Sequence, residues 1–172
     1  IGSRKGFVGY TEDPSTDLST NPTKSVFEFV DQDGISHIFV AGQNAGGTHK
    51  IWKQDQVAPY PLIALTHPAL TGSNWQMVGL GNKCYFVQAG HSVLEFDYIA
   101  APTTLVAMTN QPVVTKPNVA LAAFGHLWVG DFDADKQILE VSSLYAGGGA
   151  LTWAFSFDLG TVWPAGGDSI TA

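Results

Sequence analysis

Ala58-Pro59-Tyr60-Pro61-Leu62-Ile63-Ala64-Leu65-Thr66 has a close counterpart later in the chain, Ala101-Pro102-Thr103-Thr104-Leu105-Val106-Ala107-Met108-Thr109. The two segments begin 43 residues apart, and each follows a short run in which polar and apolar residues alternate. A repeat of about 40–50 residues built from strands is typical of a β-propeller or a related array. The pair therefore predicts an all-β fold made of repeated units.

Strand-like openings at residues 26, 75, 119 and 169 divide the chain into units. We expect units over 26–74, 75–118 and 119–168, with the start of a fourth at 169–172. Turn residues separate the strands inside each unit, and Asp33-Gly34 is a strong hairpin signal. The prediction is a β-propeller-like array of antiparallel blades spanning 26–172, preceded by a polar, extended N-terminal arm over 1–25.

Three units and a fragment do not close a ring, because known propellers have at least about four blades. Two arrangements stay open: the units are part of a larger propeller, or they form an open stack of sheets. A β-sandwich with similar strand lengths is the alternative fold. The chain starts with Ile1 rather than methionine, so we expect a processed chain or a section of a longer polypeptide.

The charge balance argues against tight nucleic-acid binding. The 172 residues carry a formal net charge of −7, and Arg4 is the only arginine. Phosphate recognition relies on clusters of arginine and lysine, so at most a passive contact with DNA is expected. No apolar stretch approaches the roughly 20 residues of a membrane span. Cys84 is the only cysteine, which excludes an intrachain disulfide and predicts a small buried hydrophobe.

Asp131, Asp133 and Asp135 resemble the start of a calcium-binding loop, since alternate aspartates can direct several oxygens at one cation. That pattern continues with glycine at its sixth position and glutamate at its twelfth, where this chain has Lys136 and Ser142. A solvated hairpin tip is the favoured interpretation, and calcium binding stays open. Zinc spacing is missing among the five histidines, His37, His49, His67, His91 and His126. His37 and His126 stand just before the second strands of their units, and for these two we expect strand-edge or core roles.

Signatures of catalysis are scarce. The chain has no G-x-S-x-G motif, and its Gly147-Gly148-Gly149 run lacks the lysine of a phosphate-binding loop. Paired carboxylates for glycoside hydrolysis remain an alternative, with four strand-associated candidates: Glu95, Asp97, Asp131 and Glu140. We expect no enzymatic activity, no catalytic residue, no cofactor and no metal.

The aromatic residues are expected to pack between units. Trp52, Trp75, Trp128 and Trp153 fall on predicted strands, where large side chains cover pleated surfaces. Trp163 precedes a proline in a loop and is expected to cover one end of the core or to meet a partner. Tyr60 is a further loop-tip aromatic that could contact a ligand.

The end of the chain resembles the tail nozzle proteins of short-tailed bacteriophages, also called tail tubular or tail hub proteins. The similarity rests on Phe124-Gly125-His126-Leu127-Trp128-Val129 and on Thr161-Val162-Trp163-Pro164-Ala165-Gly166-Gly167-Asp168-Ser169-Ile170-Thr171-Ala172. Leu139–Leu144 stands where that family has its second strand, and Arg4-Lys5-Gly6-Phe7 is similar to the start of its first blade. The chain departs from the family pattern at Lys5 and Ser143-Leu144.

The resemblance implies a structural protein of the virion, in the phage tail, assembled in the host cytoplasm. It implies a homo-oligomeric ring with a propeller outside and a channel that guides genome ejection. Its partners would be other tail proteins: the adaptor, neighbouring nozzle subunits and fibres. An acidic wall would let DNA slide through. The alternative function is a carbohydrate- or protein-binding propeller module of a virion or a bacterial surface.

Overall fold

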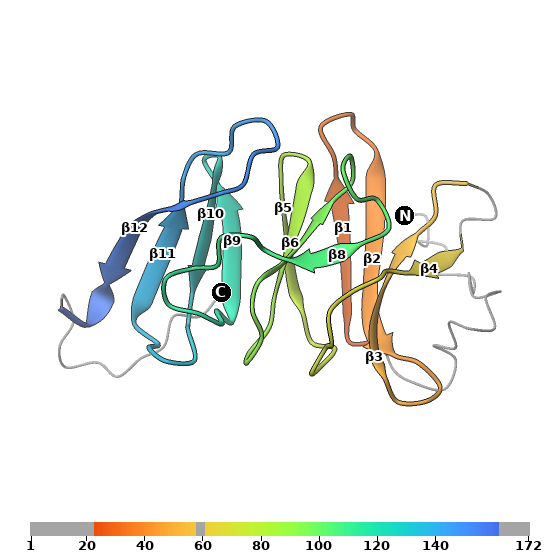
Figure 1. The fold of residues 1–172 in the computed structure, drawn as a ribbon, viewed down its shortest axis with the longest axis horizontal. Helices are drawn as coiled ribbons and strands as arrows, with labels where there is room; N and C mark the ends of the chain where they lie inside the picture. The colour runs from red at the N-terminus through yellow and green to blue at the C-terminus, as the bar shows by residue number, and fades with distance from the viewer. Residues whose placement is uncertain (1–22, 58–60, 162–172) are drawn as a thin grey trace, which may run out of the picture.

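The computed structural model describes residues 23–57 and 61–161, which are almost entirely β-structure (Figure 1). The elements in these residues are β1 (Ser25–Val30), β2 (Ser36–Gln43), β3 (His49–Gln54), β4 (Leu62–Ala64), β5 (Gln76–Leu80), β6 (Lys83–Val87), β7 (Leu94–Asp97), β8 (Leu105–Ala107), β9 (Val119–Ala123), β10 (His126–Gly130), β11 (Ile138–Ser142), β12 (Trp153–Asp158) and the short 3-10 helix η1 (Leu159–Thr161). They form three antiparallel sheets of four strands, β1–β4, β5–β8 and β9–β12. The prediction of an all-β fold is confirmed.

The repeated segments form the outermost strands of the first two sheets. Residues Leu62–Ala64 are β4 and residues Leu105–Ala107 are β8. Just outside these strands, Thr66 and Thr104 form a parallel bridge, in which the N–H of Leu105 donates to the carbonyl of Thr66 at 2.7 Å. The two copies of the repeat therefore tie neighbouring sheets together at their outer edge.

Several tight turns contain residues with positive φ, and the sequence predicts some of these turns. Gly34 has φ +79° in the predicted Asp33-Gly34 turn, where glycine carries no steric cost. The turn between β9 and β10 has positive φ at both of its central residues, Phe124 at +54° and Gly125 at +77°. Phenylalanine is an unusual choice at such a position, because its Cβ crowds the following carbonyl oxygen.

The three sheets stack side by side through their first strands, with β1 against β5 and β5 against β9 (Figure 1). We call the face of each sheet that is turned toward the next sheet in the chain its forward face, and the opposite face its rear face. A four-stranded sheet with one bare apolar face is unstable in water. Stacking buries the forward face of one sheet against the rear face of the next.

Two apolar cores result. The core between the first two sheets is built around Phe29, Phe39, Ile51, Leu65, Met77, Cys84, Phe86, Leu94, Phe96 and Leu105. The core between the second and third sheets contains Leu80, Tyr85, Val87, Val93, Met108, Ala120, Leu127, Val129, Phe132 and Leu151. Phe39 meets the rings of Phe86 and Phe96 edge-on, with centroids 5.3 and 5.0 Å apart. Each core is thus a layer between two sheets.

Closure into a propeller is not seen: the described residues form three stacked sheets without a closed ring. The fourth unit expected at 169–172 lies outside the described residues, as do residues 1–22 of the expected arm. The first strand begins at Ser25, one residue inside that predicted arm. None of the helices in the described part of the chain has the length and apolar character needed to cross a bilayer.

Candidate binding site between the second and third sheets

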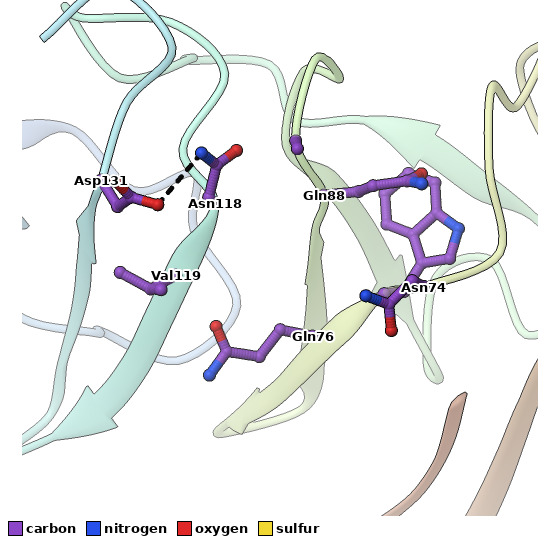
Figure 2. Close-up of a pocket in the computed structure, with 8 residues that line it drawn as sticks. Asn74, Gln76, Gln88, Asn118, Val119 and Asp131 are labelled. Carbon is purple, nitrogen blue, oxygen red and sulfur yellow. Dashed lines mark hydrogen bonds between the residues drawn. The ribbon is translucent and has the colours of Figure 1, made fainter. Parts of the chain in front are cut away.

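A polar cleft opens between the second and third sheets, where β5 and β9 begin (Figure 2). Its volume is about 580 Å³. The residues that line it are Asn74, Trp75, Gln76, Gln88, Ala89, Asn118, Val119 and Asp131. Four carboxamides and one carboxylate face this space, and no basic side chain is among the lining residues. This composition suits a neutral ligand rich in hydroxyl groups better than an anion.

Two hydrogen bonds fix the walls of the cleft. Gln76 Oε1 accepts from the backbone N–H of Ala120 at 2.7 Å, which links β5 to β9. On the opposite wall, Asn118 Nδ2 donates to Asp131 Oδ2 at 3.1 Å (Figure 2). Asp131 has φ +52°, an uncommon conformation for a residue other than glycine. Strained conformations of this kind recur at functional sites.

Within the part of the chain that the structure describes, three buried oxygens of the lining side chains accept no hydrogen bond: Gln88 Oε1, Asn118 Oδ1 and Asp131 Oδ1. The Lys136 ammonium lies 3.5 Å from Asp131 Oδ1, a long contact made by a half-exposed lysine. Buried acceptors are nearly always paired with a donor of the protein, of water or of a ligand. These oxygens have almost no accessible surface, so they are not open to a ligand in the cleft.

The aspartates of the suspected calcium loop do not converge. Asp131 bonds to Asn118, and Asp133 is exposed. The carboxylate of Asp135 accepts from the backbone N–H of Gln137 at 2.9 Å, which stabilises the local turn. Throughout the described ranges, no three side chains of His, Cys, Asp or Glu come close enough to hold a metal ion. The local turn contacts of this segment agree with the favoured interpretation, a hairpin tip.

Glu95, Asp97 and Glu140, the other candidates for a glycosidase carboxylate pair, form structural contacts and do not face each other across a cleft. Lys83 Nζ lies 3.4 Å from Glu95 Oε1 and 3.9 Å from Asp97 Oδ2. Asp97 also accepts from the backbone N–H groups of Ile99 and Ala100. Glu140 is fully buried, and its two oxygens accept from consecutive backbone N–H groups of the linker between β8 and β9. These contacts hold linkers and turns in place.

His37 forms the closest histidine–carboxylate pair. Its Nε2 donates to Asp31 Oδ2 at 2.8 Å, and both side chains are buried. The His37 ring also stacks on Phe29, with centroids 5.8 Å apart. Burial raises the pKa of Asp31, but hydrogen bonds from His37 and from the amides of Ile35 and Asp33 outweigh it, so this pKa lies below its ordinary value. The pair braces the turn between β1 and β2.

His49 and Ser73 are in contact although they lie 24 positions apart, a spacing that does not predict a contact. His49 Nδ1 is 2.7 Å from Ser73 Oγ. The Ser73 hydroxyl donates to the carbonyl of Gly42 at 2.7 Å, so it accepts its hydrogen bond from His49. A catalytic serine needs the reverse, a histidine that takes its proton. The pair joins the first sheet to the start of the second.

The other three histidines bond to backbone carbonyls. His67 bonds to Pro68, His91 to Ser92 and Ala69, and His126 to Ser142. His37 and His126 occupy equivalent positions, two residues before Phe39 and Trp128 in the second strands of their sheets. The strand positions of His37 and His126 agree with the strand-edge or core roles expected for these two residues.

The cysteine side chain and most of the described tryptophan side chains are buried or half-buried against the sheets. Cys84 is fully buried, and burial raises the pKa of its thiol well above the ordinary value. Trp75 is buried in the first core, and Trp153 is half-buried against the second core and donates to the carbonyl of Asn110 at 2.9 Å, as expected for packing between units. Trp52 is buried on the rear face of the first sheet and belongs to neither core, so for this residue the prediction is wrong. Trp128 is half-buried on the forward face of the third sheet. Tyr60 and Trp163 lie outside the described residues.

Sequence reasoning missed the cleft residues Asn74, Gln76, Gln88 and Asn118. Carboxamides carry no spacing motif, and these four come from three separate segments that meet only when the second and third sheets stack. In the comparisons with known proteins, no family model, no curated protein and no solved structure matches the chain. What the fold defines is a class: an all-β protein built from stacked four-stranded units.

Proposed function

We propose that this chain is a structural protein of a virion, a propeller-type section of the tail nozzle of a short-tailed bacteriophage. The observation that carries the proposal is the stack itself: three consecutive four-stranded sheets packed through β1, β5 and β9. This is the arrangement of blades in a propeller. The identification with a tail nozzle rests on the sequence resemblance of residues 124–129 and 161–172.

The roles of the polar residues support a non-enzymatic function. The buried or half-buried carboxylates of Asp31, Glu95, Asp97 and Glu140 bind backbone amides or neighbouring side chains of the stack. The net charge of −7 supports a wall along which DNA slides without being held. In this function the chain acts by contact with other tail proteins, in a homo-oligomeric ring that guides genome ejection.

Immunogold labelling of intact phage particles tests the proposal. An antibody raised against the purified chain should label the tail below the capsid, and pre-immune serum should label nothing. Labelling confined to the capsid shell, or particles that carry no copy of the chain by mass spectrometry, would contradict the proposed role.

A second candidate function, carbohydrate binding, is favoured by one observation: the cleft is lined by four carboxamides and by no basic side chain. Neutral saccharides offer hydroxyl groups to such side chains. Titration of the ¹⁵N-labelled chain with glucose, galactose, rhamnose and N-acetylglucosamine would reveal binding as amide shifts around Gln76 and Asn118. Asn118→Ala should abolish those shifts, whereas Thr48→Ala, an exposed change in the loop between β2 and β3, should leave them intact. Spectra that none of the four sugars changes would reject this candidate.

A further inference from the structure

The strand registers define one equivalent row of side chains on the forward face of each sheet. The rows are Phe27–Phe39–Lys53–Ile63, Val78–Tyr85–Glu95–Val106 and Leu121–Trp128–Val141–Phe155. Side chains paired across antiparallel strands point to the same face of a sheet. Each row therefore shows how far the forward face of its sheet is covered.

In the first two sheets the next sheet covers the second-strand member of the row, while the fourth-strand members Ile63 and Val106 stay 40% and 41% exposed. Phe39 is fully buried against the rings of Phe86 and Phe96 on the second sheet. Tyr85 is fully buried in the core that also holds Leu127 and Val129 of the third sheet. In both cases the covering sheet presents an apolar rear face.

The row of the third sheet is the exception. Leu121 is 59% exposed, although its row equivalents Phe27 and Val78 on the first strands are half-buried. Phe155 is 60% exposed, where its equivalents on the fourth strands, Ile63 and Val106, are 40% and 41% exposed. Trp128 is only half-buried, where Phe39 and Tyr85 are fully buried. Phe157 lies beside Phe155 with ring centroids 6.3 Å apart, and it is exposed as well. A large aromatic face is thus left in water.

This face is also less charged than the two covered ones. The first two rows contain Lys53 and Glu95, and the third has Val141 at the same position. Lys83 and Asp97 pair on the forward face of the second sheet, whereas the third sheet has His126 at the position of Lys83. Contiguous apolar surface of this kind marks an interaction site.

We propose that the forward face of the third sheet, with Leu121, Trp128, Leu139, Phe155 and Phe157, is the docking surface for the rear face of a fourth four-stranded sheet. The occupant is the unit that follows β12 in the polypeptide, which sequence analysis expects to begin at residue 169. The inference rests on the stacked array of the proposed function, and it goes further in naming the surface and its occupant.

Chain order selects this occupant. The sheet β5–β8 covers the sheet β1–β4, and β9–β12 covers β5–β8, so each forward face is covered by the next unit of the same chain. A second copy stacked head to tail would have to offer the rear face of its first sheet. On that rear face Trp52 and Val40 are buried on the middle strands, while Val26 and Val30 on β1 are 56% exposed.

The test compares the 172-residue chain with a chain extended by one unit. A second copy of residues 108–161, with the rear-face residues Ala120, Leu127 and Val129, is added after Ala172 as the probe. Hydrogen exchange of β9 and β12 in the original unit should slow by about tenfold or more in the extended chain, because local opening becomes costlier when a surface is covered. Binding of the dye ANS to exposed apolar surface should fall.

Two double variants make the test specific. Leu121→Glu with Phe155→Glu in the original unit should abolish the added protection. The control pair, Val26→Glu with Val30→Glu, changes equally apolar residues that are 56% exposed on β1, and it should leave the added protection in place. Exchange that is unchanged by the extra unit, or protection that survives the Leu121/Phe155 pair, would overturn the proposal.

Measurements on the 172-residue chain alone decide the remaining cases, including an extended chain that does not fold. There, the Leu121/Phe155 pair should reduce ANS binding and leave the urea midpoint unchanged. If the pair unfolds the chain, Leu121 and Phe155 are already packed within it. If the pair converts a dimer to a monomer, the occupant is a second copy. Either result would refute the proposal. If the antibody does not label phage tails but hydrogen exchange slows as expected, the virion role is rejected and the docking surface is not.

Discussion

The buried carboxylate of Glu140 accepts a hydrogen bond from the backbone N–H of Val114 through Oε1 at 2.8 Å. Its other oxygen, Oε2, accepts from the N–H of Val113 at the same distance. Glu140 lies on the middle strand β11, and the two valines belong to the linker that leads from the second sheet into the third. One side chain therefore positions the passage between two units.

Glu140→Gln should destabilise the chain by about 1–3 kcal/mol, because the new NH₂ group replaces an acceptor and faces a buried N–H donor. Urea unfolding followed by circular dichroism measures the change. The control is Glu28→Gln, which alters an exposed carboxylate that accepts from Ser36; it should shift stability by no more than about 0.5 kcal/mol. Equal shifts for both variants would contradict the role given to Glu140.

The Asp31–His37 pair should make stability depend on pH in the acid range. The folded-state pKa of Asp31 lies below its ordinary value of 3.8, so its contribution is complete above that value and disappears as pH falls through the folded-state pKa. Urea midpoints of the native chain and of Asp31→Asn should differ at about pH 5 and converge toward about pH 2.5. A constant difference over this range would contradict the prediction.

Phe124 should be replaceable with a gain in stability. Its φ of +54° costs a non-glycine residue about 1 kcal/mol, and its side chain is 90% exposed, so packing does not offset the strain. Phe124→Gly is expected to raise the free energy of unfolding by about 0.5–1 kcal/mol. The matched control is Val113→Gly, at an exposed position with ordinary φ, which should not stabilise. A loss of stability in Phe124→Gly would indicate packing of the ring.

Gly79 should tolerate no side chain, because a Cβ there would overlap the ring of Phe29 across the interface between the first two sheets. Gly79→Ala is expected to cost about 1–3 kcal/mol through overpacking. Gly46→Ala supplies the comparison, since its Cβ would make an ordinary 3.5 Å contact with Asn44 Oδ1. Thermal unfolding of the two variants measures the difference, and an unchanged melting temperature for Gly79→Ala would show that the sheets can separate.

Cys84 should be unreactive in the folded chain. Burial keeps the thiol from reagents and raises its pKa, and only the thiolate reacts. Ellman's reagent should titrate one thiol in urea and show at least a tenfold slower reaction under native conditions, an expectation of about that order from local opening. Fast reaction without denaturant would show that the first core opens readily.

Much of the fold follows from local sequence. Alternation of apolar and polar residues marks the strands, and the turn residues divide them; the APxxL pattern places β4 and β8, and 151–157 overlaps β12. The burial of Cys84 also follows from its place in an apolar run. These features depend on residues within a few positions of each other, so the chain alone determines them.

Tertiary structure decided the rest. Gln76, Gln88 and Asn118 line one cleft because the second and third sheets stack. His49 contacts Ser73, although their spacing in the sequence does not predict a contact. The exposure of Leu121 cannot be predicted from the sequence, since Val78, at the same position of the second sheet, shows the same alternation and is half-buried. The physical reason is that alternation tells which residues share a face of a sheet, while burial depends on what is packed against that face.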